Sequence, residues 1–147
     1  MIRHHLILRV ITKLLVSTII LFALYVQFHG DFSPGGGFQA GVIMAAAFIF
    51  YGLVFGLENV QKVFPPWLVH KLVALGVLIF AGTGVVSMFL GYDYLDYDAF
   101  APHHPSHGQH YGILAVELGV LVTVTGVMVA IYYAFAGRPP QVSDEDW

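Results

Sequence analysis

The sequence predicts an all-α, polytopic membrane protein with four transmembrane helices. Of its 147 residues, 58% are apolar and 10% are charged, and the mean hydropathy is +0.77. A soluble domain carries about 25% charged residues, so this chain has too few to cover its own surface in water. Four charge-poor stretches are each long enough to cross a bilayer, which takes about 20 residues. They occupy residues 6–28, 34–57, 68–90 and 111–136, and we expect residues 1–137 to form one integral membrane domain.

The first span follows two arginines, Arg3 and Arg9, and resembles a secretory signal peptide. It is too long for the apolar region of such a peptide and no cleavage site of small residues follows it, so we expect it to be retained. Lys13 lies near its amino end. This lysine is a candidate for an ion pathway, but a long basic side chain near a span end can also extend to the interface.

The second span follows a polar, glycine-rich run, HGDFSPGGG, at 29–37. Ser33 suits the N-cap and Pro34 suits the first helical position, so we expect the helix to begin at Pro34. Its first turn would then expose backbone N–H groups at the positive end of the helix dipole, where an anion or a water chain can bind. His29 and Asp31 are further candidates for an ion or proton pathway. The glycines of this first turn are Gly35, Gly36 and Gly37.

Small residues recur along one face of the second span and one face of the fourth. Glycine weakens a helix in water but lets a second helix approach closely in lipid, so these faces predict close helix packing. The pattern does not say whether they meet each other or another polypeptide. The second span contributes Gly37, Gly41, Ala45, Gly52 and Gly56, and the fourth contributes Gly112, Gly119 and Gly126.

Orientation follows from the basic residues. All 6 lysines and arginines lie at the amino end, around the loop between the second and third spans, or after the fourth span. The segments 29–37 and 91–110 contain none. The positive-inside rule therefore places both termini in the cytoplasm. Residues 138–147 form a short acidic tail, which we expect to be cytoplasmic and disordered.

Glu117 is the strongest candidate for a functional residue, because it lies within the fourth span. A charged residue in the bilayer costs about 2.5–3.5 kcal/mol even on permissive scales and normally faces a partner or a wet path. At 100° per residue, Glu117 points nearly opposite to Gly112 and Gly119, so we expect neighbours on both sides of this helix. Two interpretations stay open: a proton or cation relay, or a carboxylic acid that only braces a neighbouring helix.

The histidines provide little support for a metal or a haem. The loop HHPSHGQH at 103–110 has spacings that suit a metal, but Pro105 and Gly108 argue against a helix that would align its histidines. His29 and His70 lie at span ends, so no histidine sits where a b-type haem needs one. With 0 cysteines there is no thiolate site. We therefore expect no cofactor and no metal, and the net charge of -3 argues against nucleic acid.

The run PGGGFQAG at 34–41, supported by GILAVELGV in the last span, resembles the MnhB family, which forms one of the subunits of the multisubunit Mrp-type cation/proton antiporters. The resemblance covers most of the chain. It implies a membrane protein that works only with other integral membrane subunits, in an assembly that exchanges Na⁺ or another monovalent cation for protons across a bacterial inner membrane. Related modules occur in membrane-bound hydrogenase-type complexes.

Two rival functions share some of these features. A purely structural scaffold subunit would have the same spans and glycine faces and would differ only in the role of Glu117. An intramembrane metal-dependent hydrolase would use the outer histidines, but the spans lack a paired acid and base. We therefore expect a transporter subunit rather than an enzyme.

Overall fold

The computed structural model describes residues 6–30, 35–102 and 104–138, and within these ranges it is helical without strands. Four helices are long and apolar enough to cross a membrane, which confirms the predicted all-α class with four spans. The described elements are α1 (Leu6–Phe28), α2 (Gly37–Phe55), α3 (Leu57–Val63), α4 (Pro66–Phe89), η2 (Tyr97–Phe100) and α5 (Pro105–Ala136).

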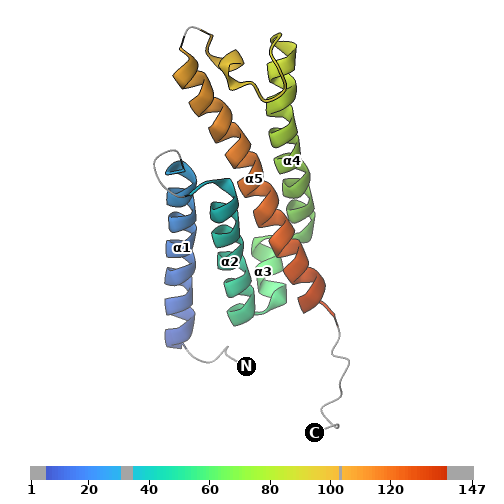
Figure 1. Cartoon of the computed structure of the whole chain (residues 1–147). Coiled ribbons are helices and arrows are strands. Elements are labelled where there is room, and N and C mark those ends of the chain that lie inside the picture. The colour runs from blue at the N-terminus through green and yellow to red at the C-terminus, as the bar shows by residue number, and fades with distance from the viewer. Residues whose placement is uncertain (1–5, 31–34, 103, 139–147) are drawn as a thin grey trace.

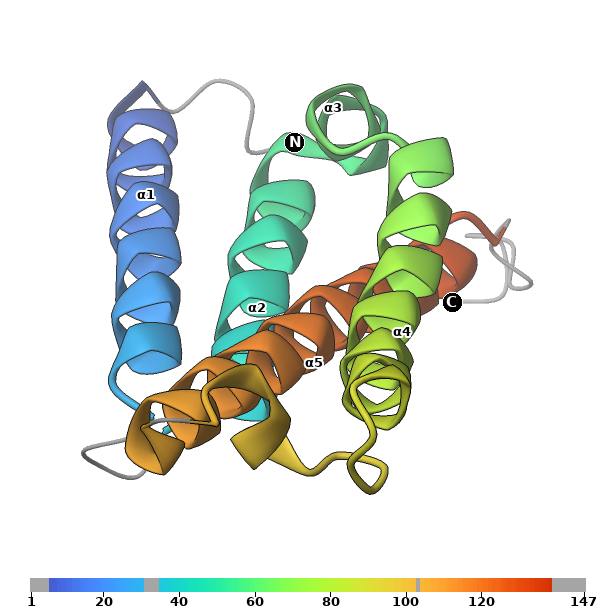
Figure 2. The same cartoon turned by 90° about the horizontal axis from the view of Figure 1, so that it is seen from above.

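The long helices pack in the order α1, α2, α5, α4 (Figure 1). Seen from above, α5 crosses between α2 and α4, and α1 lies at the edge of the bundle against α2 (Figure 2). Helix α1 is therefore the least covered of the four: Leu14 and Leu21 are each 67% exposed. In a bilayer, faces of this kind meet lipid or other membrane subunits.

The second helix differs from the expected span at both ends. It begins at Gly37 rather than Pro34, because Gly36 has φ 119° and ψ −177°, far from helical values. It ends at Phe55, because Gly56 has φ 92°. Gly35 and Gly36 thus precede the helix, and the expected cap at Ser33 and Pro34 lies outside the described residues.

The short helix α3 was not predicted. Its 7 residues include Glu58 and Lys62, so it is too short and too polar to resemble a span. It begins directly after Gly56, and Asn59 Nδ2 donates a hydrogen bond to the Phe55 carbonyl at 2.6 Å, which ties α3 to the end of α2. Helix α3 therefore forms a polar elbow between two spans.

Helix α5 begins at Pro105, six residues before the expected start of the span. The interpretation of Pro105 and Gly108 as helix breakers was wrong. Proline is well tolerated at the first helical position, because the N–H it lacks would have no intrahelical partner there. Gly108 is buried against the Tyr97 carbonyl of η2. At 1.5 Å per residue α5 is about 48 Å long, so one end projects beyond a bilayer core of about 30 Å.

The main apolar core lies where α2, α4 and α5 converge near α3. Ala45, Val69 and Val129 are almost fully buried there with Phe64, and the rings of Phe48 and Phe64 stack at 4.4 Å. Tyr133 Oη donates a hydrogen bond to the Phe64 carbonyl at 2.6 Å, which fixes the end of α5 to the elbow. This core sets the position of α5 relative to α2, and hence the position of Glu117.

Replacing Tyr133 by phenylalanine is expected to lower stability modestly. The change removes only the hydroxyl, and hydrogen bonds between membrane helices contribute about 0.6–1.7 kcal/mol. Thermal unfolding of the protein in detergent measures the loss. Tyr111→Phe is the matched control, because Tyr111 is 57% exposed. Equal destabilisation by both changes would contradict the role given to the Tyr133 hydroxyl.

Candidate functional site beside Glu117

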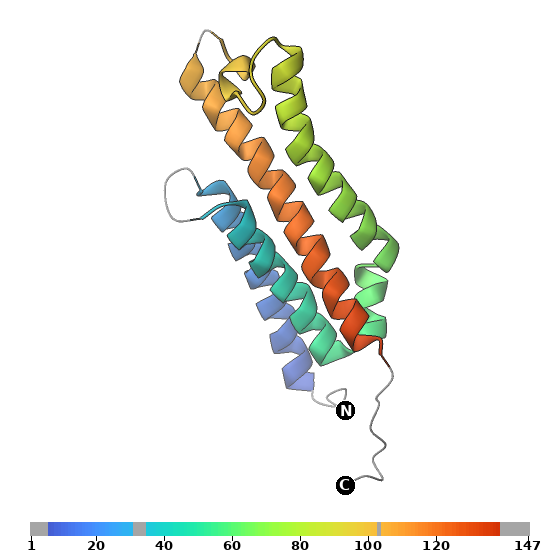
Figure 3. The ribbon, with the colours of Figure 1, turned by 45° about the vertical axis from the view of Figure 1, so that its right-hand side comes forward.

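Glu117 lies on the side of α5 that faces the end of α1 and the beginning of α2. These two helix ends lie beside α5 well below its first residues (Figure 3). The side chain is partly buried. Both neighbouring segments are held there by packing of α2 against α5 and of α1 against α2. The carboxylate therefore sits inside this chain's own bundle, facing its own backbone.

Three glycines surround Glu117, and we call the space between them the glycine pocket. A Cβ atom placed on Gly30 would lie 2.9 Å from Oε1 and 3.0 Å from Oε2 of the carboxylate, and one placed on Gly36 would lie 2.7 Å from Oε1. A Cβ on Gly37 would overlap the backbone carbonyl of Glu117. Gly36 also has φ +119°, a conformation that L side chains rarely adopt. Any side chain at these positions would displace the carboxylate or the helix that carries it.

The carboxylate lies at the positive end of the α2 dipole. The first hydrogen bond within this helix runs from the Ala40 amide to the Gly36 carbonyl, at 3.0 Å. The amides of Gly37, Phe38 and Gln39 therefore have no acceptor within the helix. Backbone N–H groups of this kind stabilise a nearby negative charge. The site can thus hold an ionised carboxylate within a largely apolar bundle, which is the chemical requirement for a group that exchanges protons or cations.

The other predicted pathway residues differ in their distance from Glu117. His29 precedes Gly30, and its ring stacks on Tyr25 at 4.6 Å, so it lies at the rim of the site. Asp31 lies outside the described residues, as does Pro34 of the motif. Lys13 is exposed and sits 17 residues before Gly30, about 25 Å away along α1. The structure does not bring Lys13 to Glu117.

The glycine face of α2 meets α5. A Cβ on Gly41 would lie 2.8 Å from Val124 Cβ and 3.0 Å from the Leu121 carbonyl, and one on Gly52 would lie 2.6 Å from the Tyr132 hydroxyl. Thr125 Oγ1 also donates to the Gly41 carbonyl at 3.3 Å. Gly56 is different: it is exposed, lies outside the helix, and has nothing within 4 Å of a Cβ position. Gly56 therefore serves the elbow and takes no part in the close packing within this chain.

The glycine face of α5 meets α4 and η2 instead. A Cβ on Gly119 would lie 2.8 Å from the Gly76 carbonyl, and one on Gly126 would lie 2.7 Å from Val73. Gly112 lies directly beneath the Tyr97 ring. The two glycine faces thus meet neighbours within this chain but not each other, a choice that the sequence pattern left open.

Sequence reasoning missed several residues of these contacts. Gly76 of α4 packs against Thr123 and the Gly119 carbonyl, and Gly84 packs against the Tyr94 ring. Their spacing of eight residues is a helical repeat that could have identified them. Gly30 was also missed, because its importance depends on how the chain turns after α1, and no local pattern records that.

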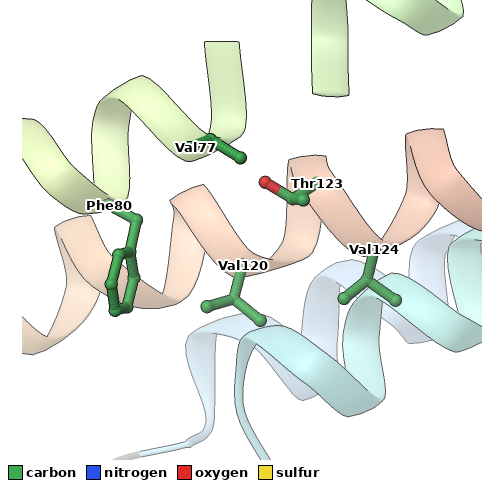
Figure 4. A pocket seen from close by; sticks show the side chains of 5 residues that line it. All are labelled: Val77, Phe80, Val120, Thr123 and Val124. Carbon is green, nitrogen blue, oxygen red and sulfur yellow. The ribbon is translucent and has the colours of Figure 1, made fainter. Parts of the chain in front are cut away.

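An apolar pocket of about 170 Å³ is lined by residues of α4 and α5. Figure 4 shows the lining side chains, which are Val77 and Phe80 from α4 and Val120, Thr123 and Val124 from α5. The Thr123 hydroxyl donates to the Gly119 carbonyl at 2.8 Å. These five lining residues carry no charge and offer no site for an ion.

The outer histidines lie partly on α5, where His107 and His110 are exposed. The rings of His104 and His107 meet edge to face at 5.8 Å. Across the described residues, no three histidine, cysteine or acidic side chains gather closely enough to hold a metal ion. His103 lies outside those residues.

Comparison with known proteins identifies a family. A family model described as "Domain related to MnhB subunit of Na+/H+ antiporter" matches residues 7–130, a region that contains Glu117 and its three glycines. A protein of Staphylococcus haemolyticus (strain JCSC1435), named "Putative antiporter subunit mnhB2", is 38% identical over 133 residues, which cover 89% of this chain and 94% of that relative. A protein of the same name from Staphylococcus aureus (strain Newman) is 35% identical over the same shares of both chains.

Proposed function

The chain belongs to the family of MnhB subunits of multisubunit Na⁺/H⁺ antiporters, and we propose that Glu117 is a proton- and cation-exchanging group of such an assembly. The observation that supports this role most strongly is the glycine pocket. Gly30, Gly36 and Gly37 leave room for a carboxylate beside the amino end of α2. A carboxylate held this way can release its proton without leaving the protein, because helix dipole and backbone amides stabilise the charge.

The purely structural alternative uses the same contacts. In that case the carboxylate only joins α5 to the beginning of α2, as a charged helix cap does. The relay is favoured because a structural contact does not require an ionisable group. A neutral side chain of the same length could accept the same backbone hydrogen bonds without the cost of burying a charge in the bilayer.

In the proposed orientation, both termini lie in the cytoplasm of a bacterium and the four helices cross its inner membrane. The start of α1 and the end of α5 lie at the same end of the bundle (Figure 1). That end also carries α3 with Lys62 and the first turns of α4 with Lys71. The positive-inside rule then assigns this end to the cytoplasm. The basic residues described at this end are Arg9, Lys13, Lys62, Lys71 and Arg138.

The other subunits of the assembly complete the ion path, of which this chain forms only a part. The chain acts as part of a secondary transporter, driven by gradients of Na⁺ and H⁺, and catalyses no chemical reaction of its own. Its partners are the other integral membrane subunits, which meet the exposed faces of helices such as α1. Because its exchanging carboxylate lies on one helix, the rest of the ion path belongs in part to those subunits.

Carbodiimide labelling of the purified complex tests the proposal. This reagent modifies carboxyl groups that take up a proton in apolar surroundings. Because the proposed role requires Glu117 to take up and release a proton, Glu117 is expected to react and Na⁺/H⁺ exchange to fall in step with its modification. Mass spectrometry of this chain measures the modified fraction. Glu58 of α3, which is exposed rather than held in apolar surroundings, is the internal control and should stay unmodified. Complete modification of Glu117 with undiminished exchange would refute a relay role.

A further inference from the structure

The side chain of Gln27 is buried without a hydrogen-bond partner among the residues that the structure describes. It lies in the last turn of α1 and is 1% exposed. Neither Oε1 nor Nε2 is paired with any described group. Burying an amide in this state is costly in any protein, and more so in a bilayer, where no bulk water can relieve it. Something beyond the described side chains must satisfy this amide.

The chemistry of the amide selects the ligand. Oε1 needs a donor and Nε2 needs an acceptor, and the described residues supply neither. A sodium ion would satisfy only the oxygen and would repel the N–H groups. A water molecule donates to one and accepts from the other, as buried waters in proteins usually do. The need for a donor and an acceptor together therefore favours water over a metal cation.

Gln27 is also adjacent to the Glu117 site. It precedes Gly30 by three residues, in the last turn of α1. Gly30 in turn lies against both carboxylate oxygens of Glu117. Farther inward on the buried side of α1 comes Ala23, which is apolar and fully buried. Gln27 is thus the polar group of α1 nearest to the glycine pocket on its inner side.

We propose that the Gln27 amide binds a buried water molecule that continues the proton path inward from Glu117. The water site follows from Gln27 itself, whereas its part in conduction rests on the proposed function of Glu117. In this arrangement the water bound by the amide passes a proton to and from the carboxyl group of Glu117. No covalent bond other than O–H bonds changes in this step.

Replacing Gln27 by leucine tests the path. The leucine has a similar volume and cannot bind water, so exchange is expected to fall about tenfold or more, because protons do not cross an apolar gap. The complex should still assemble with equal or higher thermal stability, because an unpaired buried amide has been removed. Exchange at the wild-type rate would overturn the inference, and so would a parallel loss of exchange and stability, which indicates a packing role.

Thr18→Val is the control. Thr18 is exposed on α1, and its hydroxyl donates to the Leu14 carbonyl at 2.9 Å, so it offers no buried water site. This change should leave exchange within about twofold of the wild type, as expected for a near-isosteric change at an exposed position. An equal loss in both variants would attribute the effect to general loosening of α1 and overturn the inference.

A structure of the intact complex at a resolution that shows waters provides the direct observation. A water is expected at hydrogen-bond distance from Gln27, about 2.7–3.2 Å. An amide satisfied by residues 31–34 or by another subunit, with no water, would overturn the site. Failure of the proposed function has a different result: a Glu117→Gln variant would then exchange normally. Failure of this inference alone leaves Glu117 essential and Gln27→Leu active.

Discussion

Replacing Gly37 by alanine is expected to prevent this subunit from assembling. The new Cβ would overlap the carbonyl oxygen, the carbonyl carbon and the Cα of Glu117, all of them backbone atoms that no side-chain rotation can move. Helices α2 and α5 would have to separate along the segment that forms the glycine pocket. Overpacking costs about 1–3 kcal/mol where side chains can adjust, and more where they cannot. The measurement is the amount of complex that co-purifies with a tag on this chain.

Alanine variants of two other glycines serve as comparisons for the assembly of Gly37→Ala. Gly82 of α4 has nothing within 4 Å of a Cβ position, so Gly82→Ala should assemble normally. At Gly52 the Cβ would meet the ring and hydroxyl of Tyr132, the far end of a side chain that can shift, so Gly52→Ala should have an intermediate yield. Normal assembly of Gly37→Ala, or an equal defect in all three variants, would contradict the packing derived for the glycine pocket.

The class of fold was predictable because it depends on the overall composition and on the lengths of the apolar stretches, which can be read directly from the sequence. The lengths of the apolar stretches and the scarcity of charge already imply four helices in a bilayer. Small residues that recur at spacings of four and seven identified two packing faces. The pattern did not show which helix packs against each face. Partners depend on the order α1, α2, α5, α4, which is a property of the whole bundle.

The ends of the helices were less predictable, because they depend on single backbone conformations. A proline indicated a helix start at 34 and a helix break at 105, yet the second proline opens α5. Gly36 and Gly56 lie outside α2 because of their positive φ angles, whereas Gly37 lies inside it. Composition does not distinguish these three glycines. The three glycines differ in their neighbours. Gly36 and Gly37 lie against Glu117, whereas Gly56 directly precedes α3.

The candidate site was predictable in its central residue only. Glu117 was identified because an acidic residue within a span needs an explanation. Its surroundings were not, since Gly30 meets the Glu117 carboxylate only once the helices have packed together. The expectation that α5 has neighbours on both faces agrees with the structure, but those neighbours are α2 and α4 of the same chain.

This arrangement limits how partner subunits can bind. The close-packing faces of α2 and α5 are already occupied by helices of this chain. The faces that remain, above all on α1, carry bulky apolar side chains such as Leu14, Leu21 and Phe28. The faces left for other membrane subunits therefore present large apolar side chains rather than glycines.

Glu117→Gln is expected to abolish exchange while leaving the complex intact. The amide has the size of the carboxylate, and its oxygen can still accept hydrogen bonds at the beginning of α2, so the glycine pocket remains filled. It cannot release or take up a proton. Loss of a group that transfers protons typically costs about 10²–10⁴-fold in rate. Sodium-driven proton movement in vesicles measures exchange, and co-purification of the subunits measures assembly.

Glu58→Gln provides the matched control, because Glu58 is exposed on α3 and the change removes the same charge from the same chain. It should leave both exchange and assembly unchanged. If Glu117→Gln exchanges normally, the carboxylate only joins α5 to α2 and the scaffold alternative is correct. If it fails to assemble, the carboxylate itself holds the two helices together, through its charge or through the second acceptor oxygen that the amide replaces with a donor. Loss of exchange in a fully assembled complex is the one result that requires an ionisable group at this position.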